Sequence, residues 1–381
     1  MERHIVHMDL DTFFVSCERL MNSQLNNIPL IIGGGDRGVV ASCSYEARVF
    51  GVRSAMPMKM ALRLCPQAKV VKGDMELYSK LSRTVTEIIG EKAPVMEKAS
   101  IDEFYIDMTG MDKFFGAYAW TRELVHTITR ETGLPLSYSL SINKTVSKMA
   151  TNEGKPNGKL QVTQPMVRPF LNPLSIRKIP MLGEQTFTLL SRIGIRTIET
   201  LAQMPKEILQ QMIGKNGLEL WKKANGLDFS EVEPYRERKS ISTEQTFGQD
   251  TIDMVKMKSI LTGMVEKLAF QLRDEQWLTA VVTVKIRYAN FDTETKQRRI
   301  AYTSADHILS RVVLELFEAL FQRRMRLRLI GIQFGGLVRG TYQINLFEDT
   351  IEMMSLYQAM DRMKKRFGSN AVTRGGEYKR K

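Results

Sequence analysis

Two acidic segments that lie far apart in the chain carry the side chains best suited to chemistry. The first reads HMDLDTFF at residues 7–14, and the second reads SIDEFYID at residues 100–107. Each places carboxylates, Asp9 in the first and Asp102 and Glu103 in the second, at the end of an apolar run. An ionised carboxylate in a protein interior is costly unless a cation or a hydrogen-bond donor pairs with it. One metal site shared by both segments explains the two placements.

These carboxylates suit Mg²⁺, which prefers hard oxygen ligands and keeps open positions for substrate phosphates. Two such ions about 3.5 to 4 Å apart can activate an attacking 3′-hydroxyl and stabilise a departing pyrophosphate. Neighbouring residues of a regular strand point to opposite faces, so Asp102 and Glu103 reach one site only at a hairpin bend. For either segment alone a plainer interpretation stays open, in which Asp9 and Asp11 cap the following helix and the other pair lies in a turn.

The segments around the acidic residues alternate between strand and helix patterns. We expect strands at residues 5–8, 95–100, 104–108 and 136–142, and helices at residues 12–20, 78–90, 120–132 and 144–151. The hairpin signals between them predict an α+β domain around an antiparallel sheet.

The second half of the chain has a different pattern. Four prolines between residues 165 and 180 punctuate short helical segments, and the pattern continues to about residue 230, which predicts a small all-helical domain. The charged segment EVEPYRERK at residues 231–239 is typical of a linker. Residues 240–337 then follow the order strand, helix, strand, strand, helix, strand, which predicts a split βαββαβ domain.

Length and charge narrow the class of protein. The 381 residues are enough for two to four domains. A formal net charge of +13 favours a polyanionic partner, either nucleic acid or an anionic membrane surface. The first residues lack the apolar core of a signal peptide, and no apolar run approaches the ~20 residues that span a bilayer. We therefore expect a soluble, cytoplasmic protein without a membrane partner.

Five motifs occur in one order along the chain. They are DLDTFF at residues 9–14, SYEARVFGV at 44–52, SIDEFYID at 100–107, SINKTVSKMA at 141–150 and KPNG at 155–158. Together they resemble the Y family of DNA polymerases, and within it the bacterial DNA polymerase IV (DinB-like) branch. The resemblance extends over almost the whole chain.

The resemblance implies a multidomain α+β fold with the right-hand arrangement of a polymerase. The implied parts are a palm at residues 1–10 and 72–163, fingers at 11–71, a helix-hairpin-helix-like thumb at 164–232, a linker at 233–239, a βαββαβ little finger at 240–341, and a clamp-binding motif with a tail at 342–381. It also implies low-fidelity, template-directed DNA synthesis by a monomer that bypasses damaged template bases. The substrates are then primer–template DNA and deoxynucleoside triphosphates.

The resemblance assigns the acidic residues to two Mg²⁺ ions. Asp9 and Asp102 bridge the ions, Glu103 completes the catalytic one, and the backbone carbonyl of Leu10 ligates the ion on the nucleotide side. Asp11 is then expected to be a helix-start residue rather than a ligand, because it precedes the position where a cap is expected.

The resemblance also suggests nucleotide contacts. Phe14 lies under the sugar of the incoming nucleotide, where its ring would collide with a ribose 2′-hydroxyl, and Phe13, the other ring of this nucleotide-side pair, is expected to pack in the core. Tyr45 and Arg48 stand three residues apart, which places them on one face of a helix. With Lys148 they are the expected triphosphate contacts, since the Arg fork suits phosphate oxygens.

Two further segments resemble DNA-binding elements. Residues 179–184 are similar to a helix-hairpin-helix turn, which points backbone amides at a phosphate, although Met181 stands where a second glycine is common. A plain interhelical turn is the alternative. In the little finger, Thr283, Lys285 and Arg287 share one strand face, and with Lys296, Arg298 and Arg299 on the next strand they could follow a DNA backbone.

The segment after the last predicted strand resembles a clamp-binding motif. Gln343, Leu346 and Phe347 match the QxxLF pattern by which bacterial polymerases bind the sliding clamp. The alternative is that Leu346 and Phe347 anchor the tail to the domain.

Two other functions fit part of the pattern. A nucleotidyl cyclase also uses acidic hairpins and metals, but it leaves the basic C-terminal half unexplained. A non-catalytic DNA-binding protein would explain the basic charge, but its affinity for DNA would gain from loss of the carboxylates.

Overall fold

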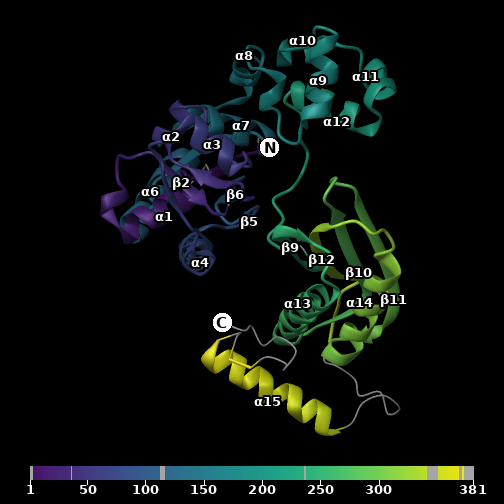
Figure 1. The fold of residues 1–381 in the computed structure, drawn as a ribbon. Coiled ribbons are helices and arrows are strands. Elements are labelled where there is room, and N and C mark those ends of the chain that lie inside the picture. The colour runs from purple at the N-terminus through teal and green to yellow at the C-terminus, as the bar shows by residue number, and fades with distance from the viewer. Residues whose placement is uncertain are drawn as a thin grey trace. The chain divides into compact units, whose positions relative to one another are not determined.

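The chain folds into two compact units, Met1–Arg236 and Glu237–Lys381 (Figure 1). The computed structural model describes residues 3–35, 37–111, 116–235, 237–340, 351–368 and 371–372. The boundary between the units falls inside the segment that the sequence suggests as a linker.

The first unit is built on a five-stranded N-terminal sheet. Its order is β5-β6-β1-β7-β8, made of Met96–Lys98, Glu103–Asp107, Ile5–Leu10, Leu136–Ser141 and Lys159–Val162. The central strand β1 pairs antiparallel with β6 and β7, while β7 and β8 are parallel. All six residues of β1 are buried, so both faces of this strand are covered.

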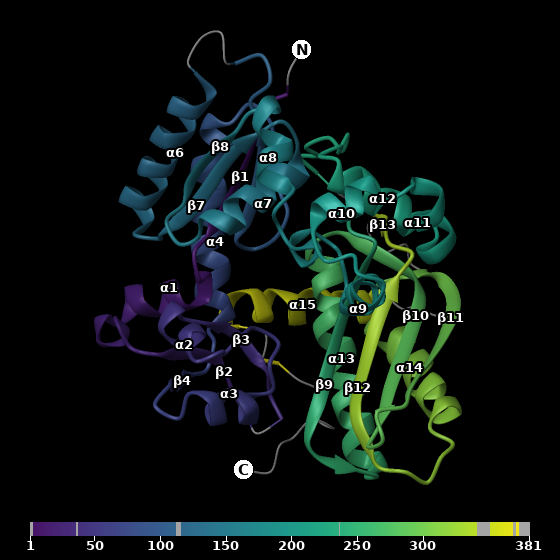
Figure 2. The same ribbon diagram turned by 90° about the horizontal axis from the view of Figure 1, so that it is seen from above.

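The two faces of the N-terminal sheet differ in chemistry. Val6, Met8 and Leu10 pack with apolar side chains of α4 (Met75–Lys92) and α6 (Ala117–Thr132) on one face. Helix α7 (Lys144–Gly154) contacts β1, β7 and β8 on the other face (Figure 2). There the sheet presents polar residues, among them His7, Asp9, Ser137 and Ser139. Helix α7 supplies a partner for Ser139, whose hydroxyl donates to the carbonyl of Ser147.

A second, small sheet follows α1 (Phe13–Met21) and a short 3₁₀ turn (Ser23–Leu25). Its order is β3-β2-β4, made of Val40–Cys43, Leu30–Gly33 and Lys69–Val71. Helices α2 (Tyr45–Val49) and α3 (Met58–Leu64) belong to this region, and Ser44 caps α2 by accepting a hydrogen bond from the amide of Ala47. An apolar cluster that includes Ile31, Val40 and Ala61 forms its core.

Residues 164–224 form only helices and turns, as the proline pattern predicted. The helices are α8 (Val167–Leu171), α9 (Glu184–Arg192), α10 (Ile198–Gln203), α11 (Lys206–Ile213) and α12 (Lys215–Ala224), with 3₁₀ turns at Gln164–Met166 and Ile176–Lys178. Their core also contains Val146, Met149 and Ala150 of α7. Helix α7 therefore packs its apolar face on the helical region and its polar face on the N-terminal sheet.

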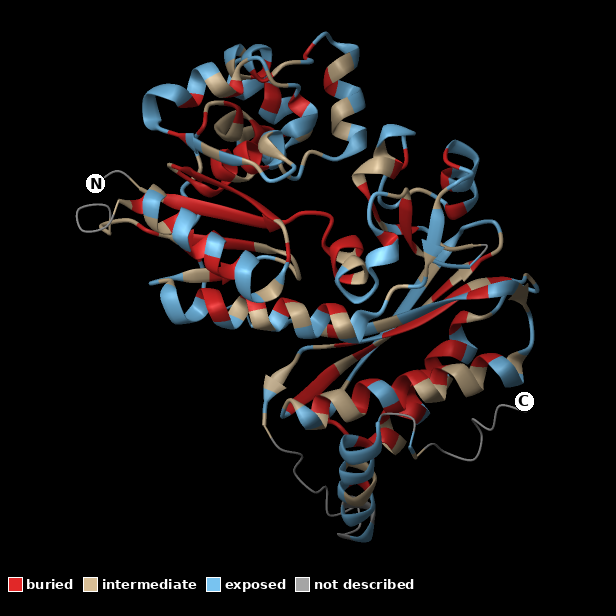
Figure 3. Cartoon of the chain, turned by 90° about the vertical axis from the view of Figure 1, so that its left-hand side faces the viewer, coloured by how far each residue is buried: buried red, intermediate tan, exposed pale blue. Residues whose placement is uncertain are grey.

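The second unit has the predicted βαββαβ order. It runs β9 (Ser240–Thr251), α13 (Met254–Asp274), β10 (Trp277–Tyr288), β11 (Thr293–Thr303), α14 (Asp306–Leu320) and β12 (Leu327–Gly335), and the strands lie in the order β11-β10-β12-β9 with β13 (Val338–Arg339) beside β10. Both helices pack on one face of this C-terminal sheet. Buried strands and exposed outer helix faces are visible in both units (Figure 3).

Helix α15 (Ile351–Phe367) is anchored to the second unit by charged side chains. Arg273 of α13 pairs with Asp361 at 2.7 Å and with the fully buried Asp306 at 2.6 Å. Among the described helices, none combines the length and the apolar character needed to cross a bilayer.

Candidate active site

The three predicted carboxylates come from neighbouring backbone positions at one edge of the N-terminal sheet. Asp9 is the cross-strand partner of Glu103, and the amide of Leu10 donates to the carbonyl of Asp102 at 3.0 Å. Asp102 lies in the bend between β5 and β6, and Glu103 is the first residue of β6. The hairpin bend that the sequence required is therefore present.

The bend is held by two serine side chains. Ser100 donates to Oδ1 of Asp102 at 2.6 Å, and its hydroxyl oxygen accepts from the amides of Asp102 and Glu103 at 3.3 and 3.1 Å. Ser82 of α4 donates to the carbonyl of Ile101. The backbone of the bend is thus tied to itself and to the helix behind it.

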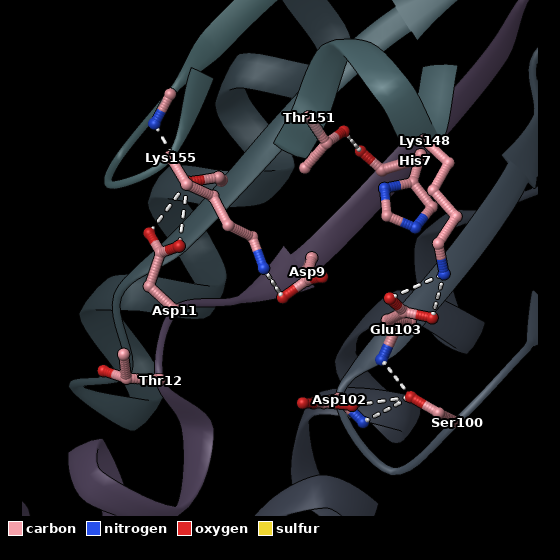
Figure 4. Close-up of polar contacts among 12 residues, drawn as sticks. His7, Asp9, Asp11, Thr12, Ser100, Asp102, Glu103, Lys148, Thr151 and Lys155 are labelled. Carbon is pink, nitrogen blue, oxygen red and sulfur yellow. Dashed lines mark hydrogen bonds and ion pairs between the residues drawn. The ribbon is translucent and has the colours of Figure 1, made fainter. Parts of the chain in front are cut away.

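Two lysines of α7 and one just after the helix pair with carboxylates of the sheet, and Figure 4 shows Lys148 and Lys155 among them. Lys144 pairs with Glu97 at 2.6 Å, Lys148 contacts both oxygens of Glu103 at 2.8 and 2.7 Å, and Lys155 pairs with Asp9. Lys144 and Lys148 are four residues apart on one face of α7, and Lys155 is the C-cap residue that follows this helix. We refer to Lys144, Lys148 and Lys155 as the lysine row.

Each member of the trio has its own partner in this arrangement. Ser100 holds Asp102, Lys148 holds Glu103 and Lys155 holds Asp9, and in the described part of the chain no three His, Cys, Asp or Glu side chains gather closely enough to hold a metal ion. The donor set still fits a divalent cation, because hard carboxylate oxygens stand on adjacent backbone positions. These three side chains would have to rotate away from their present partners to meet around a cation.

Burial perturbs the carboxylate of Asp9. It raises the pKa of Asp9 from 3.8 to about 7, and repulsion from Glu103 and Asp102 adds to the effect while Lys155 opposes it. The repulsion shows that the three groups share one electrostatic environment. A divalent cation among them would relieve both the burial cost and the repulsion.

His7 lies beside this cluster and remains neutral. Its ring is fully buried, and its centroid lies 4.7 Å from that of the Tyr105 ring. Among the described residues, neither ring nitrogen has a hydrogen-bond partner. Burial and the nearby Lys148 and Lys155 hold the pKa of His7 well below its usual range. The lysine row therefore provides the positive charge on this face of the sheet.

Asp11 is a helix-start residue, as expected, but it is not the helix cap of the plainer interpretation. It lies at the start of α1, but neither its side chain nor that of Thr12, the N-cap residue, caps the helix. Its carboxylate instead accepts from Tyr45, Ser137 and the amide of Asn157. Capping needs a side chain that turns back toward the first helical amides, and these three donors hold Asp11 in another direction.

The two phenylalanines after the first acidic segment lie in different environments. Phe13 is 2% exposed within the core, whereas Phe14 is partly exposed. The ring of Phe14 stacks on Tyr78 with centroids 4.4 Å apart and planes at 13°, and the hydroxyl of Tyr78 donates to Glu18 at 2.6 Å. The ring expected to face a sugar is thus supported from behind by a fixed aromatic side chain.

Of the expected triphosphate contacts, Tyr45 and Arg48 share one face of α2. The guanidinium of Arg48 lies 4.8 Å from the centre of the Tyr45 ring. Lys148 instead contacts Glu103, and Lys155 is a further cation at the carboxylates. Lys155 is the first residue of the KPNG motif, and its place at the carboxylates was not predicted; its position seven residues after Lys148 was the available signal.

The cations predicted to follow DNA along β10 and β11 do not all lie on one face of the C-terminal sheet. Lys296 and Arg298 pair with Val284 and Val282, whose buried side chains face the helices, and Arg298 contacts Glu315 of α14. Cross-strand partners share a face, so these two cations lie on the helix side of the sheet.

The structure describes the predicted helix-hairpin-helix turn but not the residues of the predicted clamp-binding motif. Met181 adopts a positive φ of 72° with a side chain that is 94% exposed, so the turn keeps the backbone conformation that a glycine would take there. Gln343, Leu346 and Phe347 lie outside the described residues.

Comparisons with known proteins place the chain in a family. The model of the impB/mucB/samB family matches residues 8–152, and that of its C-terminal domain matches residues 238–346. A DNA polymerase IV of Dehalococcoides mccartyi is 33% identical over 100% of this chain and 98% of its own length, and one of Streptococcus pneumoniae is 35% identical over 88% and 97%. A solved Y-family DNA polymerase chimera superposes with a TM-score of 0.79 at 25% identity, over 88% of this chain and 100% of its own. The chain belongs to the Y family of DNA polymerases.

Membership of this family confirms the predicted fold class and enzyme class. The chain is a DNA-directed DNA polymerase of the translesion kind, and its family depends on divalent metal ions. The comparisons do not favour a nucleotidyl cyclase or a non-catalytic accessory protein. The individual site residues and domain limits stay predictions.

The raised pKa of Asp9 predicts a pH-dependent stability. Because folding raises this pKa from 3.8 to about 7, the contribution of Asp9 is fully present below about pH 4 and is lost as the pH rises through about 7. The free energy of unfolding of the unsubstituted protein should therefore fall, relative to Asp9→Asn, by about 4 kcal/mol over this range. Urea unfolding of both proteins in EDTA measures the difference, and parallel pH profiles would contradict the assignment.

Proposed function

We propose that Asp9, Asp102 and Glu103 bind two Mg²⁺ ions and that primer extension takes place at this edge of the N-terminal sheet. The supporting observation is the register that sets Asp9 opposite Glu103, with Asp102 in the adjoining bend. Asp9 and Asp102 would hold both ions, Glu103 the catalytic ion, and the backbone carbonyl of Leu10 the ion on the nucleotide side. Bound there, the ions would activate the 3′-hydroxyl and offset charge on the leaving pyrophosphate.

The lysine row has a second function in this mechanism. Lys148 and Lys155 neutralise Glu103 and Asp9, which lets two carboxylates remain at a largely buried edge. When a divalent cation binds these carboxylates, the ammonium groups of Lys148 and Lys155 can turn toward triphosphate oxygens. Arg48 supplies a planar fork for those oxygens from α2, and Tyr45, beside it on the same helix, is the second nucleotide contact. Phe14, supported by Tyr78, excludes a ribose 2′-hydroxyl, and the buried Phe13 stabilises the start of α1.

The domain functions follow from the same assignment. The N-terminal sheet with α4, α6 and α7 serves as the palm, the small sheet as the fingers, residues 164–232 as the thumb and residues 240–341 as the little finger. The net charge of +13 supports binding of primer–template DNA along the phosphate backbone. We further propose a monomeric cytoplasmic enzyme that binds a sliding clamp through Gln343, Leu346 and Phe347.

Substitution of Asp102 tests the catalytic assignment. Asp102→Ala should lower metal-dependent primer extension by at least about 10³-fold, because transition-state charge loses a metal ligand, while duplex affinity stays nearly unchanged. Asp107→Asn is the matched control, since this carboxylate lies in the same motif and accepts from the amide of Thr109. Rapid-quench extension and fluorescence anisotropy measure the two quantities. Substantial synthesis by Asp102→Ala would reject the metal assignment.

Substitution of Phe14 tests sugar selection. Phe14→Ala removes the ring beneath the proposed sugar position, so ribonucleotides should be incorporated at least about tenfold more readily relative to deoxynucleotides. The ratio of kcat/KM for dCTP and CTP opposite template G reports this change. An unchanged ratio in a protein that still extends DNA would move the selecting residue elsewhere.

The clamp proposal predicts an effect that depends on the partner. Replacing Gln343, Leu346 and Phe347 together with Ala should shorten extension products when a loaded clamp is present and leave them unchanged without it. Asn345→Ala, a substitution inside the same segment but outside the pattern, is the control. Equal loss with and without clamp would indicate that the segment anchors the tail instead.

A further inference from the structure

Asp11 is the most highly connected side chain near the site that the proposed mechanism does not use. It is 1% exposed, and both of its carboxylate oxygens accept hydrogen bonds. Oδ1 accepts from the hydroxyls of Tyr45 at 3.2 Å and Ser137 at 3.0 Å, and Oδ2 accepts from Ser137 at 2.8 Å and the amide of Asn157 at 2.8 Å. These donors come from α2, β7 and the loop after α7, which are separated from Asp11 by 34, 126 and 146 residues.

The backbone around Asp11 holds the carboxylate in this position. Its amide donates to the carbonyl of Pro135 at 2.9 Å, and its carbonyl accepts from Ser16 at 2.7 Å. The next residue, Thr12, has φ 43° and ψ 46°, a left-handed conformation that residues with a β-branched side chain rarely adopt. Such a conformation persists where surrounding contacts determine it, and here it turns the chain between β1 and α1.

The loop after α7 is fixed at two points by two different aspartates. Lys155 pairs with Asp9, and two residues later the amide of Asn157 donates to Asp11 (Figure 4). Ser137 strengthens the second point, because its hydroxyl donates to Asp11 and accepts from the amide of Gly158 at 3.0 Å. The position of the Lys155 ammonium group at the active-site carboxylates therefore depends on Asp11 as well as on Asp9.

The same carboxylate also orients Tyr45. The tyrosine hydroxyl has a single proton, and in this structure it is directed at Asp11, so its oxygen lone pairs and ring position are set by that bond. One side chain thus connects the α2 residue expected at the triphosphate with the loop that carries Lys155.

We propose that Asp11 is a positioning residue for the incoming nucleotide: it sets the Tyr45 hydroxyl and the Lys155 loop together, and it contacts neither metal nor nucleotide itself. The inference rests on the proposed function of Tyr45 as a triphosphate contact. A carboxylate suits this role because both of its oxygens accept, whereas an amide would present N–H groups to one of the donors. The Asn157 donor is a backbone amide, so its hydrogen bond ties one oxygen of Asp11 to the loop that carries Lys155.

A double-substitution experiment tests the proposal without turnover. We would measure the Kd of the matching deoxynucleotide for the full-length enzyme bound to a dideoxy-terminated primer–template in Mg²⁺, using Asp11→Asn, Tyr45→Phe and the double variant. Asp11→Asn should weaken nucleotide binding about tenfold, and the effect should shrink to about threefold or less in the Tyr45→Phe background, because the two residues act through one bond. Duplex affinity should not change.

The controls separate the possible outcomes. Ser16→Ala removes a bond to the Asp11 backbone and should leave the nucleotide Kd unchanged. If Asp11→Asn lowers the melting temperature but not nucleotide affinity, or if its effect adds fully to that of Tyr45→Phe, Asp11 is only structural and the inference is wrong. If Tyr45→Phe alone does not change the nucleotide Kd, Tyr45 is not a triphosphate contact, and the proposed action of Asp11 through Tyr45 is wrong as well. Asp11→Ser keeps one acceptor and replaces Asp11→Asn in the cycle if the amide variant does not fold.

Discussion

The structure depends on charge compensation between α7 and the N-terminal sheet. Carboxylates gathered at a buried sheet edge repel one another and lose hydration, which raises the pKa of Asp9 to about 7. The lysine row offsets this cost with three ion pairs, to Glu97, Glu103 and Asp9. Because α7 also packs its apolar face on the helical region, the helix that neutralises the carboxylates is held on both sides.

This arrangement explains how the proposed metal ligands can fold before a metal ion binds. The bend at Asp102 is fixed by Ser100 and Ser82, and Glu103 and Asp9 are each covered by an ammonium group on a rotatable stem. Exchange of ammonium for a divalent cation then needs side-chain rotation and leaves the backbone in place. Asp11, whose carboxylate is already saturated by donors, keeps the loop of Lys155 in register during such an exchange.

The sequence was most informative where one local pattern decides the outcome. The order of elements in the second unit, the helical character of residues 164–224 and the bend at Asp102 all follow from periodicity, prolines and the needs of the acidic pair. It was misleading where pairing between strands decides: alternation within β11 alone could not show that its register with β10 puts Lys296 and Arg298 on the helix side. The roles of Lys155 and Asp11 were not predicted for a related reason, since they depend on a contact between segments that lie 146 residues apart in the sequence.

Direct titration of the site with Mn²⁺ tests the central claim most directly. We would follow free Mn²⁺ by electron paramagnetic resonance as it is added to the enzyme bound to primer–template, and compare the unsubstituted protein with Asp102→Asn and Lys148→Met. The account predicts that Asp102→Asn loses most of the site-bound Mn²⁺, while Lys148→Met binds it several-fold more tightly because the competing ammonium group is gone. Identical titration curves for the three proteins would contradict it.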